Sequence, residues 1–317
     1  MRRYIIKRVL HSLFIIWLVA TTVFIGLQLL PGGPVRTMMG PNVPERAIQE
    51  MRRELGLHKP IWIQYLDFLK SLITFQFGTS LTTQEPIEKI VMTVAPRTFS
   101  IGIVGMIVGI TLSIPTGIIS ALRKGEPSDY VATVAAFAGL SFPAFFIGIL
   151  LMLVFAVHID LFPTFGYVPI KKDPIGWAQH IILPGIAVGL PYTAVVMRMT
   201  RSSMLEVMGQ QYMKTAKSKG VSARVRLWKH ALQNALIPVV TVAGIQIALI
   251  IIGSVTVEIV FGINGIGRTL VDSILKRDYP LAQVIIIITS TVLVGMNLIV
   301  DIVYTVIDPR IRYEGES

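Results

Sequence analysis

Uncharged hydrophobic segments recur along the chain, and six of them are long enough to cross a bilayer, which takes about 20 apolar residues in a helix. They cover residues 9–35, 98–122, 130–157, 175–197, 235–257 and 279–300. The last helix is expected to continue to residue 306. Because lipid offers an unpaired backbone no water to bond, each segment is expected to be helical. The sequence therefore predicts an all-α polytopic membrane protein with six transmembrane helices.

This pattern divides the chain into three parts. Residues 1–35 hold the N-terminus and the first span, and residues 36–97 form an extracytoplasmic segment. Residues 98–317 form a core of five transmembrane helices, interrupted by a long polar loop at 198–234.

Four basic residues, at positions 2, 3, 7 and 8, precede the first apolar segment, as they would in a secretory signal peptide. That segment is longer than the 7–15 residues of a typical signal, and no A-x-A cleavage pattern follows it. We therefore expect an uncleaved first helix.

Basic residues are unevenly distributed between the segments that join the spans. The N-terminus, 123–129, 198–234 and 308–317 together hold 16 Lys and Arg against six Asp and Glu. Cytoplasmic loops carry such an excess of Lys and Arg. Both termini and the 198–234 loop are therefore expected in the cytoplasm.

The extracytoplasmic segment 36–97 predicts two amphipathic helices. One lies between Pro44, which suits a first helical turn, and Gly56, which suits a helix end. The second covers residues 61–75, where apolar residues recur at helical spacing. The pair could be a small cap on the membrane domain, a platform for an external partner, or both.

The cytoplasmic loop 198–234 predicts a short helix with one distinctive face. Gly220 is expected to end this helix, and Pro238 to start or kink the next span. Small residues at 216 and 220 would let another surface approach closely. The pattern alone is also that of an interfacial helix held by basic side chains at lipid headgroups. The residues assigned to this face and its flanks are Met208, Tyr212, Thr215, Ala216, Lys219, Gly220 and Pro238.

Composition supports a membrane location and excludes several kinds of chemistry. The chain is 53% hydrophobic and 15% charged, against roughly 25% charged in soluble proteins. Its net charge of +11 lies beside the spans, so membrane lipid rather than nucleic acid is the expected partner. Without cysteine there are no disulfides, thiolate metal sites or Cys nucleophiles. The five histidines lack metal-ligand spacing, and no catalytic, cofactor-binding or metal-binding residue is assigned.

Charged residues at span ends and glycines within spans are candidates for structural contacts. Intramembrane ionisable groups are expected to pair, and either Arg198 or Arg201 is a candidate partner for Asp301. Glu258 ends the fifth span in the same way. Gly105 and Gly109, with Gly102 nearby, permit close contact with another helix, in this chain or in a partner subunit.

The run 262–269 nearly matches the phosphate loop G-x-x-x-x-G-K-S/T, but Arg268 replaces the lysine. No apolar strand frames it, so nucleotide binding is not expected there. A glycine-rich re-entrant turn at the mouth of a pathway is the preferred interpretation.

The segment 195–242, VVMRMTRSSMLEVMGQQYMKTAKSKGVSARVRLWKHALQNALIPVVTV, resembles the inner-membrane permeases of dipeptide, oligopeptide and nickel ABC importers. Those permeases carry a cytoplasmic "EAA" loop, E-A-A-x-x-x-G, followed by a Leu-Pro pair. Aligned on Gly220, the triplet falls on residues 214–216, so Ala216 and Gly220 match the general form. Residues 236–238 correspond to the Leu-Pro pair at a longer spacing. The T-A-x-x-K-G variant is typical of the peptide branch.

The resemblance, which is to the first permease of the pair, covers nearly the whole chain. LLPGGP (29–34) is similar to the family's L-x-P-G-D-P, with Gly33 in place of Asp. Further similar segments are ELGLHKPIWIQY (54–65), FGTSL (77–81), FGINGIGRTLVDSILKRDYP (261–280) and NLIVDIVYTVIDPRIR (297–312).

The resemblance implies a type I ABC importer permease in the inner membrane of a prokaryote. A second homologous permease, two cytoplasmic ATPases and an extracytoplasmic solute-binding protein would be its partners. ATP and Mg²⁺ would be used by the ATPases, and the helix at 208–220 would dock on one of them. Peptides are the implied substrates, with nickel or oligosaccharides as alternatives.

Two other functions were weighed from the sequence. An ion-driven secondary transporter would be expected to carry inverted repeats and ionisable residues near the midplane. No convincing repeat is found, and the spans at 98–122 and 130–157 contain no ionisable residue at the midplane. A membrane enzyme would need a nucleophile–base pair or a metal constellation, and the sequence offers neither.

Overall fold

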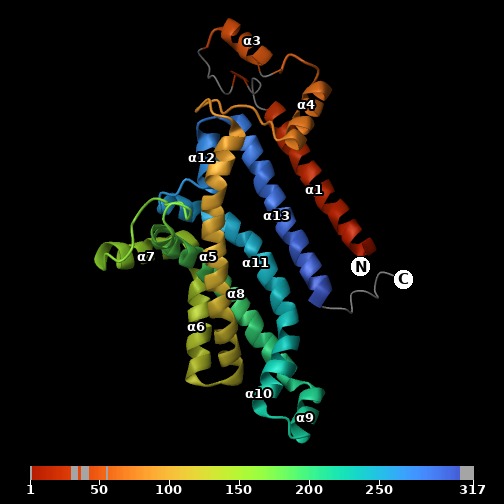
Figure 1. Ribbon diagram of the computed structural model, residues 1–317, viewed down its shortest axis with the longest axis vertical. Helices are drawn as coiled ribbons and strands as arrows, with labels where there is room; N and C mark the ends of the chain where they lie inside the picture. Colours follow the sequence, from red (N-terminus) through yellow and green to blue (C-terminus); the bar gives the residue numbers. More distant parts are fainter. Residues whose placement is uncertain (1, 30–34, 37–42, 55, 308–317) are drawn as a thin grey trace. The chain divides into compact units, whose positions relative to one another are not determined.

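The computed structural model describes residues 2–29, 35–36, 43–54 and 56–307 of the chain. In this part of the chain the regular elements are helices, and the one extended pairing is a single antiparallel bridge between Thr79 and Pro86. The predicted all-α class is therefore confirmed (Figure 1).

Contacts group the chain into two compact units. Unit 1 comprises residues 1–5, 97–264 and 296–317, and unit 2 comprises 6–96 and 265–295. Helices α5 (Ile87–Leu122) and α13 (Tyr279–Ile307) contribute residues to both units. The three-part division expected from the sequence remains a prediction.

In unit 2, helix α1 runs over Arg2–Gln28 and accounts for most of the first predicted span. That prediction extended to residue 35, and residues 30–34, which hold most of the LLPGGP motif, lie outside the described residues. The two amphipathic helices predicted in the next segment are present as α3 (Glu45–Glu54) and α4 (Ile61–Thr74). Helix α12 (Ile266–Leu275) completes the unit.

Helix α4 packs along α1 through a mixed polar and aromatic contact. The hydroxyls of Thr21 and Tyr65 lie 2.7 Å apart, and the Gln28 amide donates to the Gln64 side chain at 2.9 Å. The Phe24 ring lies 5.3 Å from the ring of Tyr65, in an edge-to-face arrangement. This contact fits the interpretation of 36–97 as a cap on the membrane domain. A platform role remains a prediction.

Asp278 fixes a second contact in unit 2, between segments nearly 200 residues apart in sequence. Its buried carboxylate accepts from the hydroxyls of Ser80 at 2.5 Å and Thr82 at 2.9 Å, and from the Thr82 backbone N–H at 3.2 Å. Its other oxygen accepts from the Leu281 N–H in the first turn of α13. Burial raises the pKa of Asp278, but these hydrogen bonds outweigh it and hold the pKa below the ordinary value.

In unit 1, helix α8 (Pro174–Gly209) is the central element and packs against α6 (Pro127–Ser141), α7 (Ala144–Leu151) and α11 (Gln233–Val260). The Asp173 carboxylate starts α8 by accepting two backbone N–H bonds at 3.0 Å, and Pro174 occupies the first turn. Buried apolar residues recur along its length and form the core with α5 and α11: Ile101, Ile181, Val188, Val196, Val239 and Val257.

The third predicted span, 130–157, is not one continuous helix. The chain breaks between α6 and α7, and the axes on either side differ by 106° (Figure 1). Pro143 supplies no N–H for the preceding turn and forces Phe142 into an extended conformation (φ −97°, ψ 132°), which ends α6. Helix α7 then continues as the π-helix η1 (Met152–His158).

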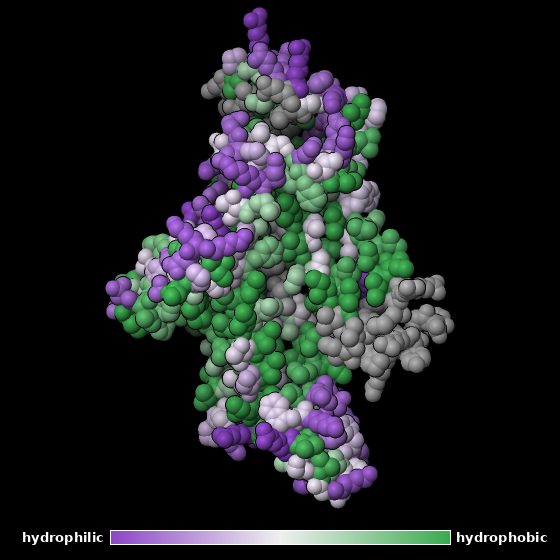
Figure 2. All heavy atoms as spheres, in the orientation of Figure 1, coloured by the Kyte–Doolittle hydropathy of each residue, from purple (hydrophilic) through white to green (hydrophobic). Residues whose placement is uncertain are grey.

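Four described helices are long and apolar enough to span a membrane, or five if the bent α6–α7 pair is one span. The fifth predicted span, 235–257, lies within α11. Hydrophobic side chains cover much of the visible flank of unit 1, whereas hydrophilic ones gather at the end where α9 and α10 lie (Figure 2). The chain is thus a multi-pass membrane protein, and the count of six spans remains a prediction.

Glycines bring α5 and α8 into backbone contact within unit 1. A Cβ on Gly189 would lie 2.6 Å from the Gly105 carbonyl oxygen, and one on Gly105 would lie 2.6 Å from the Val188 side chain. A Cβ on Gly109 would lie closer still to a neighbour, 2.1 Å from the Tyr192 ring. The sequence left open whether these glycines contact a helix of this chain or of a partner subunit. In the structure they pack against a helix of this chain.

Replacing Gly189 by Ala should destabilise unit 1, because the added methyl group meets backbone that cannot rotate away. We expect a loss of about 1–3 kcal/mol, as for other overpacked sites, measured by thermal unfolding of the purified protein in detergent. Gly253→Ala is the control, since no atom lies within 4 Å of the added methyl group. Equal unfolding temperatures for the two variants would contradict the close contact.

The Asp278 contact should make the stability of unit 2 depend on pH. Because the folded-state pKa lies below the unfolded value of about 3.9, the carboxylate stabilises fully above that value and loses its effect as pH falls through the folded pKa. The difference in the stability of unit 2 between wild type and Asp278→Asn should be constant above about pH 5 and shrink toward pH 3. Hydrogen exchange of residues 77–83 in the two proteins measures this difference. A difference that does not change with pH would refute the stabilising role of the Asp278 carboxylate.

Candidate functional site

The predicted helix at 208–220 is broken in the structure. Helix α8 continues through Met208 to Gly209, and the backbone turns at Gln210 (φ −67°, ψ 152°) before the separate helix α9, Gln211–Ser218. The extended ψ at Gln210 cannot belong to a helix. The prediction that Met208 shares one helical face with residues 212–219 is therefore wrong, because Met208 belongs to the preceding helix.

Gly220 ends α9, as the sequence predicts. Its φ of 74° lies in the left-handed region, which glycine adopts without a steric penalty. The Val221 N–H donates to the Ala216 carbonyl at 3.1 Å, and the Gly220 N–H to the Lys217 carbonyl at 3.0 Å. This pair of bonds is a Schellman motif. A Cβ on Gly220 would meet no atom within 4 Å, so backbone conformation rather than close packing accounts for the glycine.

Helix α9 has an attached side and a solvent side. Met213 packs against a buried cluster that includes Met204 and Ala231, and Ala216 is half-buried. The Tyr212 hydroxyl donates to the His230 carbonyl at 3.3 Å and accepts from the Asn234 amide at 3.2 Å. Four exposed residues of the helix form a polar stripe at positions i, i+3, i+4 and i+7: Gln211, Lys214, Thr215 and Ser218. Lys217 is exposed as well but lies outside this stripe.

The chain returns to the membrane domain through two short elements. Ser222 caps α10 (Ala223–Val225), which continues as the π-helix η2 (Arg226–Leu232) into α11. Pro238 lies inside α11 rather than at its start. The predicted residues Thr215 and Lys219 are exposed. Together these elements hold α9 between the C-terminal end of α8 and the N-terminal end of α11.

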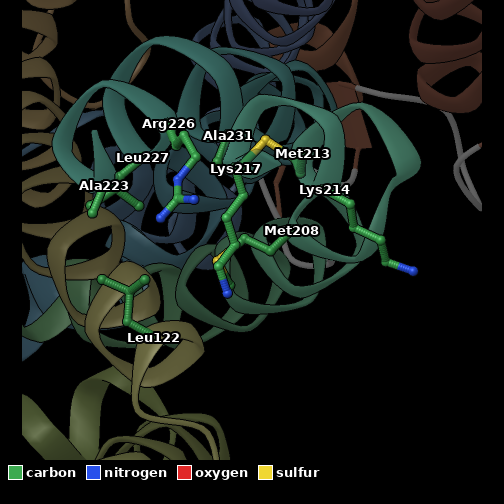
Figure 3. Close-up of a pocket in the computed structure, with 9 residues that line it drawn as sticks. All are labelled: Leu122, Met208, Met213, Lys214, Lys217, Ala223, Arg226, Leu227 and Ala231. Carbon is green, nitrogen blue, oxygen red and sulfur yellow. The ribbon is translucent and has the colours of Figure 1, made fainter. Parts of the chain in front are cut away.

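A pocket of about 400 Å³ lies behind α9 (Figure 3). Lys217 and Arg226 extend into it, whereas Lys214 points away. The pocket joins α9 to the end of α5 and to η2. Its lining residues are Leu122, Met208, Met213, Lys214, Lys217, Ala223, Arg226, Leu227 and Ala231.

Arg201 forms a two-pronged ion pair with Asp129, near the end of α8. Its Nε and Nη2 atoms donate to the two carboxylate oxygens at 2.7 and 2.8 Å. The Ser120 hydroxyl and the Gly125 N–H donate to the same carboxylate, which is 4% exposed. This cluster ties together α5, the 123–126 turn, α6 and α8. The expectation that Arg201 pairs with Asp301 is thereby corrected.

The other predicted charged residues occupy different surroundings. The Arg198 guanidinium lies 5.3 Å from the centre of the Phe137 ring, a cation–π distance. Glu258 is fully buried, and accepts from Thr98 at 2.6 Å and Ser254 at 3.4 Å, so it links α11 to α5. The run 262–269 follows helix α11 rather than a strand, which removes the structural context of a phosphate loop.

Sequence reasoning missed Asp129 and Asp278 as structural residues. Both acids lie directly beside apolar helices, and each finds hydroxyl partners from a distant or preceding segment. The nearest sequence signal is their position in the first turn or N-cap of a predicted span, where carboxylates are common. Nothing in the pattern identifies their partners.

A multi-pass helical membrane domain with a short polar helix exposed between two long helices is the architecture of a transporter's membrane subunit. Residues 113–313 match the family of binding-protein-dependent transport system inner membrane components, and residues 1–102 match the corresponding N-terminal family. The chain belongs to this family, and is therefore a permease subunit of an ABC importer rather than an enzyme.

Curated relatives align over nearly the full chain. A probable peptide ABC transporter permease of Sinorhizobium fredii is 37% identical over 310 residues, which are 98% of this chain and 99% of that protein. A putative peptide transport system permease of Brucella abortus is 37% identical over 314 residues, 99% and 100% of the two chains. A glutathione transport system permease of Salmonella choleraesuis is 38% identical over the same extent.

Removing one partner of the Asp129–Arg201 pair should cost more stability than removing both. Arg201→Ala leaves the buried Asp129 carboxylate with its charge uncompensated. The double variant, which carries Asp129→Ala as well, has no buried carboxylate at this position. A double-mutant cycle on unfolding in detergent should show strong positive coupling. Additive losses would mean that the pair contributes nothing. Asp301→Ala combined with Arg201→Ala is the control cycle and should show no coupling.

Proposed function

We propose that this chain is one of two homologous permease subunits of an ATP-driven importer that moves peptides across the cytoplasmic membrane. Two relatives that align over nearly the whole chain are named peptide permeases and one a glutathione permease. Glutathione is itself a small peptide, so the three names support one substrate class. Transport would proceed by alternating access, with no chemistry performed by this chain.

The remaining subunits would be two cytoplasmic ATPases and an extracytoplasmic solute-binding protein. ATP and Mg²⁺ would be used by the ATPases, and the permease would bind no cofactor of its own. Both termini and the α9 loop would face the cytoplasm, as the excess of Lys and Arg in those segments supports. Residues 36–97 would receive the binding protein on the opposite side.

The observation that carries the coupling mechanism is the two-sided character of α9. Its polar stripe, including Lys214, Thr215 and Ser218, is exposed, and so is available to a groove on an ATPase. Its other side is attached through Met213 to the core and through Tyr212 to Asn234 in α11. A displacement of α9 is therefore passed to both α8 and α11.

The ends of α9 favour transmission over bending. The turn at Gln210 joins α9 directly to α8, and the Schellman motif at Gly220 closes its other end with two hydrogen bonds. Just inside, the Asp129–Arg201 pair fixes α8 to α5 and α6. The closing motion of the ATPases would thus move a braced group of helices rather than a loose loop.

A bulky side chain on the stripe should separate ATP hydrolysis from transport. Thr215→Trp projects an indole from the exposed side of α9, and we expect uptake in reconstituted vesicles to fall at least about tenfold, the effect of losing 1.4 kcal/mol at the contact. Lys124→Trp, in the exposed turn after α5, is the control and should transport normally. Unchanged uptake and ATPase association in Thr215→Trp would refute docking.

A paired change at Gly220 tests the helix end separately. Asn tolerates the left-handed conformation and Val does not, while neither meets a neighbouring atom within 4 Å of its Cβ. Gly220→Asn should therefore retain more transport than Gly220→Val. Equal losses would indicate that the added volume, rather than the backbone, is what the partner rejects.

A further inference from the structure

We propose that the pocket behind α9 binds the phosphate headgroup of an anionic phospholipid from the cytoplasmic leaflet. The proposal rests on the orientation given under the proposed function, in which this loop faces the cytoplasm. It adds a ligand, and a dependence on lipid charge, that the transport role does not require.

Two cations converge in this pocket without an acidic partner. Lys217 reaches in from α9 and Arg226 from η2 (Figure 3). Neither forms an ion pair within the described part of the chain, although six other pairs are found there. Two positive side chains that share one hollow repel each other unless an anion lies between them. A phosphate, with its several acceptor oxygens, suits an arginine and a lysine.

Apart from the basic residues Lys214, Lys217 and Arg226, the lining of the pocket is apolar, and a free anion does not account for this apolar surface. Leu122, Met208 and Leu227 form much of its lining. Beside it, large apolar side chains lie open to solvent: Leu122 is 50%, Val225 42% and Trp228 55% exposed. A lipid would place its phosphate on the two cations. Its glycerol and first acyl carbons would then cover the exposed apolar side chains.

The pocket also lies at the depth where such a lipid would be found. Leu122 is the last residue of α5, a helix apolar enough to span the membrane, and Ala231 lies just before α11. Tryptophan concentrates at the membrane–water boundary, and Trp228 is on η2 at this level. Basic pockets between transmembrane helices on the cytoplasmic side recognise anionic headgroups.

A carboxylate from an ATPase is the competing occupant. The exposed polar stripe of α9 and the pocket share only Lys214, because Gln211, Thr215 and Ser218 do not line the pocket. An ATPase seated on these three residues therefore leaves Lys217 and Arg226 to another ligand. A bound lipid would brace α9 against α5 and stiffen the connection between the ATPase and α8.

Native mass spectrometry of the full chain in detergent tests binding directly. The probes are a phosphatidylglycerol, a phosphatidylcholine with the same acyl chains, and glycerol 3-phosphate as the free phosphate. At roughly fivefold per charge, Lys217→Gln with Arg226→Gln should weaken phosphatidylglycerol binding about 30-fold. Lys217→Arg with Arg226→Lys keeps both charges and should bind nearly as wild type.

Lys124→Gln with Arg224→Gln is the matched control, because it removes the same charge from two exposed residues that do not line the pocket. Binding in this control should equal that of wild type. The proposal is overturned if wild type binds both lipids equally, if the control loses as much as the pocket variant, or if glycerol 3-phosphate binds as tightly as the lipid.

Association with the ATPases, measured by pull-down of the assembled transporter, separates this proposal from the coupling role. If the pocket variant keeps its lipid but loses the ATPases, the pocket belongs to the ATPase and the lipid proposal fails. If it loses the lipid and keeps the ATPases, the proposal stands. A failure of Thr215→Trp to affect docking would contradict the coupling role alone.

Discussion

The backbone contact between α5 and α8 is the constraint on which unit 1 depends. Where Gly189 meets the Gly105 carbonyl, no side chain separates the helices. In lipid, helix association gains little from the hydrophobic effect and relies on close packing. The contact sets α8 against α5 along its length, and only then can Ser120 and Arg201 reach the same carboxylate on Asp129. Close packing between two apolar helices thus orders the end of the unit at which α9 lies.

Buried acids in both units accept hydrogen bonds from hydroxyl groups. Asp278 in unit 2 accepts from Ser80 and Thr82, and Glu258 in unit 1 from Thr98. A hydroxyl supplies a donor at little desolvation cost, whereas an unpaired buried carboxylate is expensive. In a chain with only 15% charged residues, such contacts join segments that are distant in sequence.

The sequence predicted what local chemistry determines and missed what the tertiary structure determines. Apolar length placed the long helices, and the requirement for a left-handed residue placed the end of α9 at Gly220. Hydropathy identified an apolar segment through Pro143 but not the 106° break there, because hydropathy does not report the direction of the chain. The partner of Arg201 was misassigned, since charge pairing between Asp129 and a residue 72 positions away leaves no periodic signal. The stop at Gln210 follows Gly209, a glycine that the helical spacing of the flanking residues outweighed in the prediction.

The break at Gln210 changes how the coupling loop can work. A continuous helix through 208–220 would act as an extension of α8 and would pass on rotation about its axis. Two helices joined by one extended residue pass on displacement instead, provided that the second is held elsewhere. Met213 and Tyr212 provide that hold, on the core and on α11. In the proposed coupling role, the small helix would therefore move two membrane helices together, and a ligand in the pocket on its inner side would set how stiffly it does so.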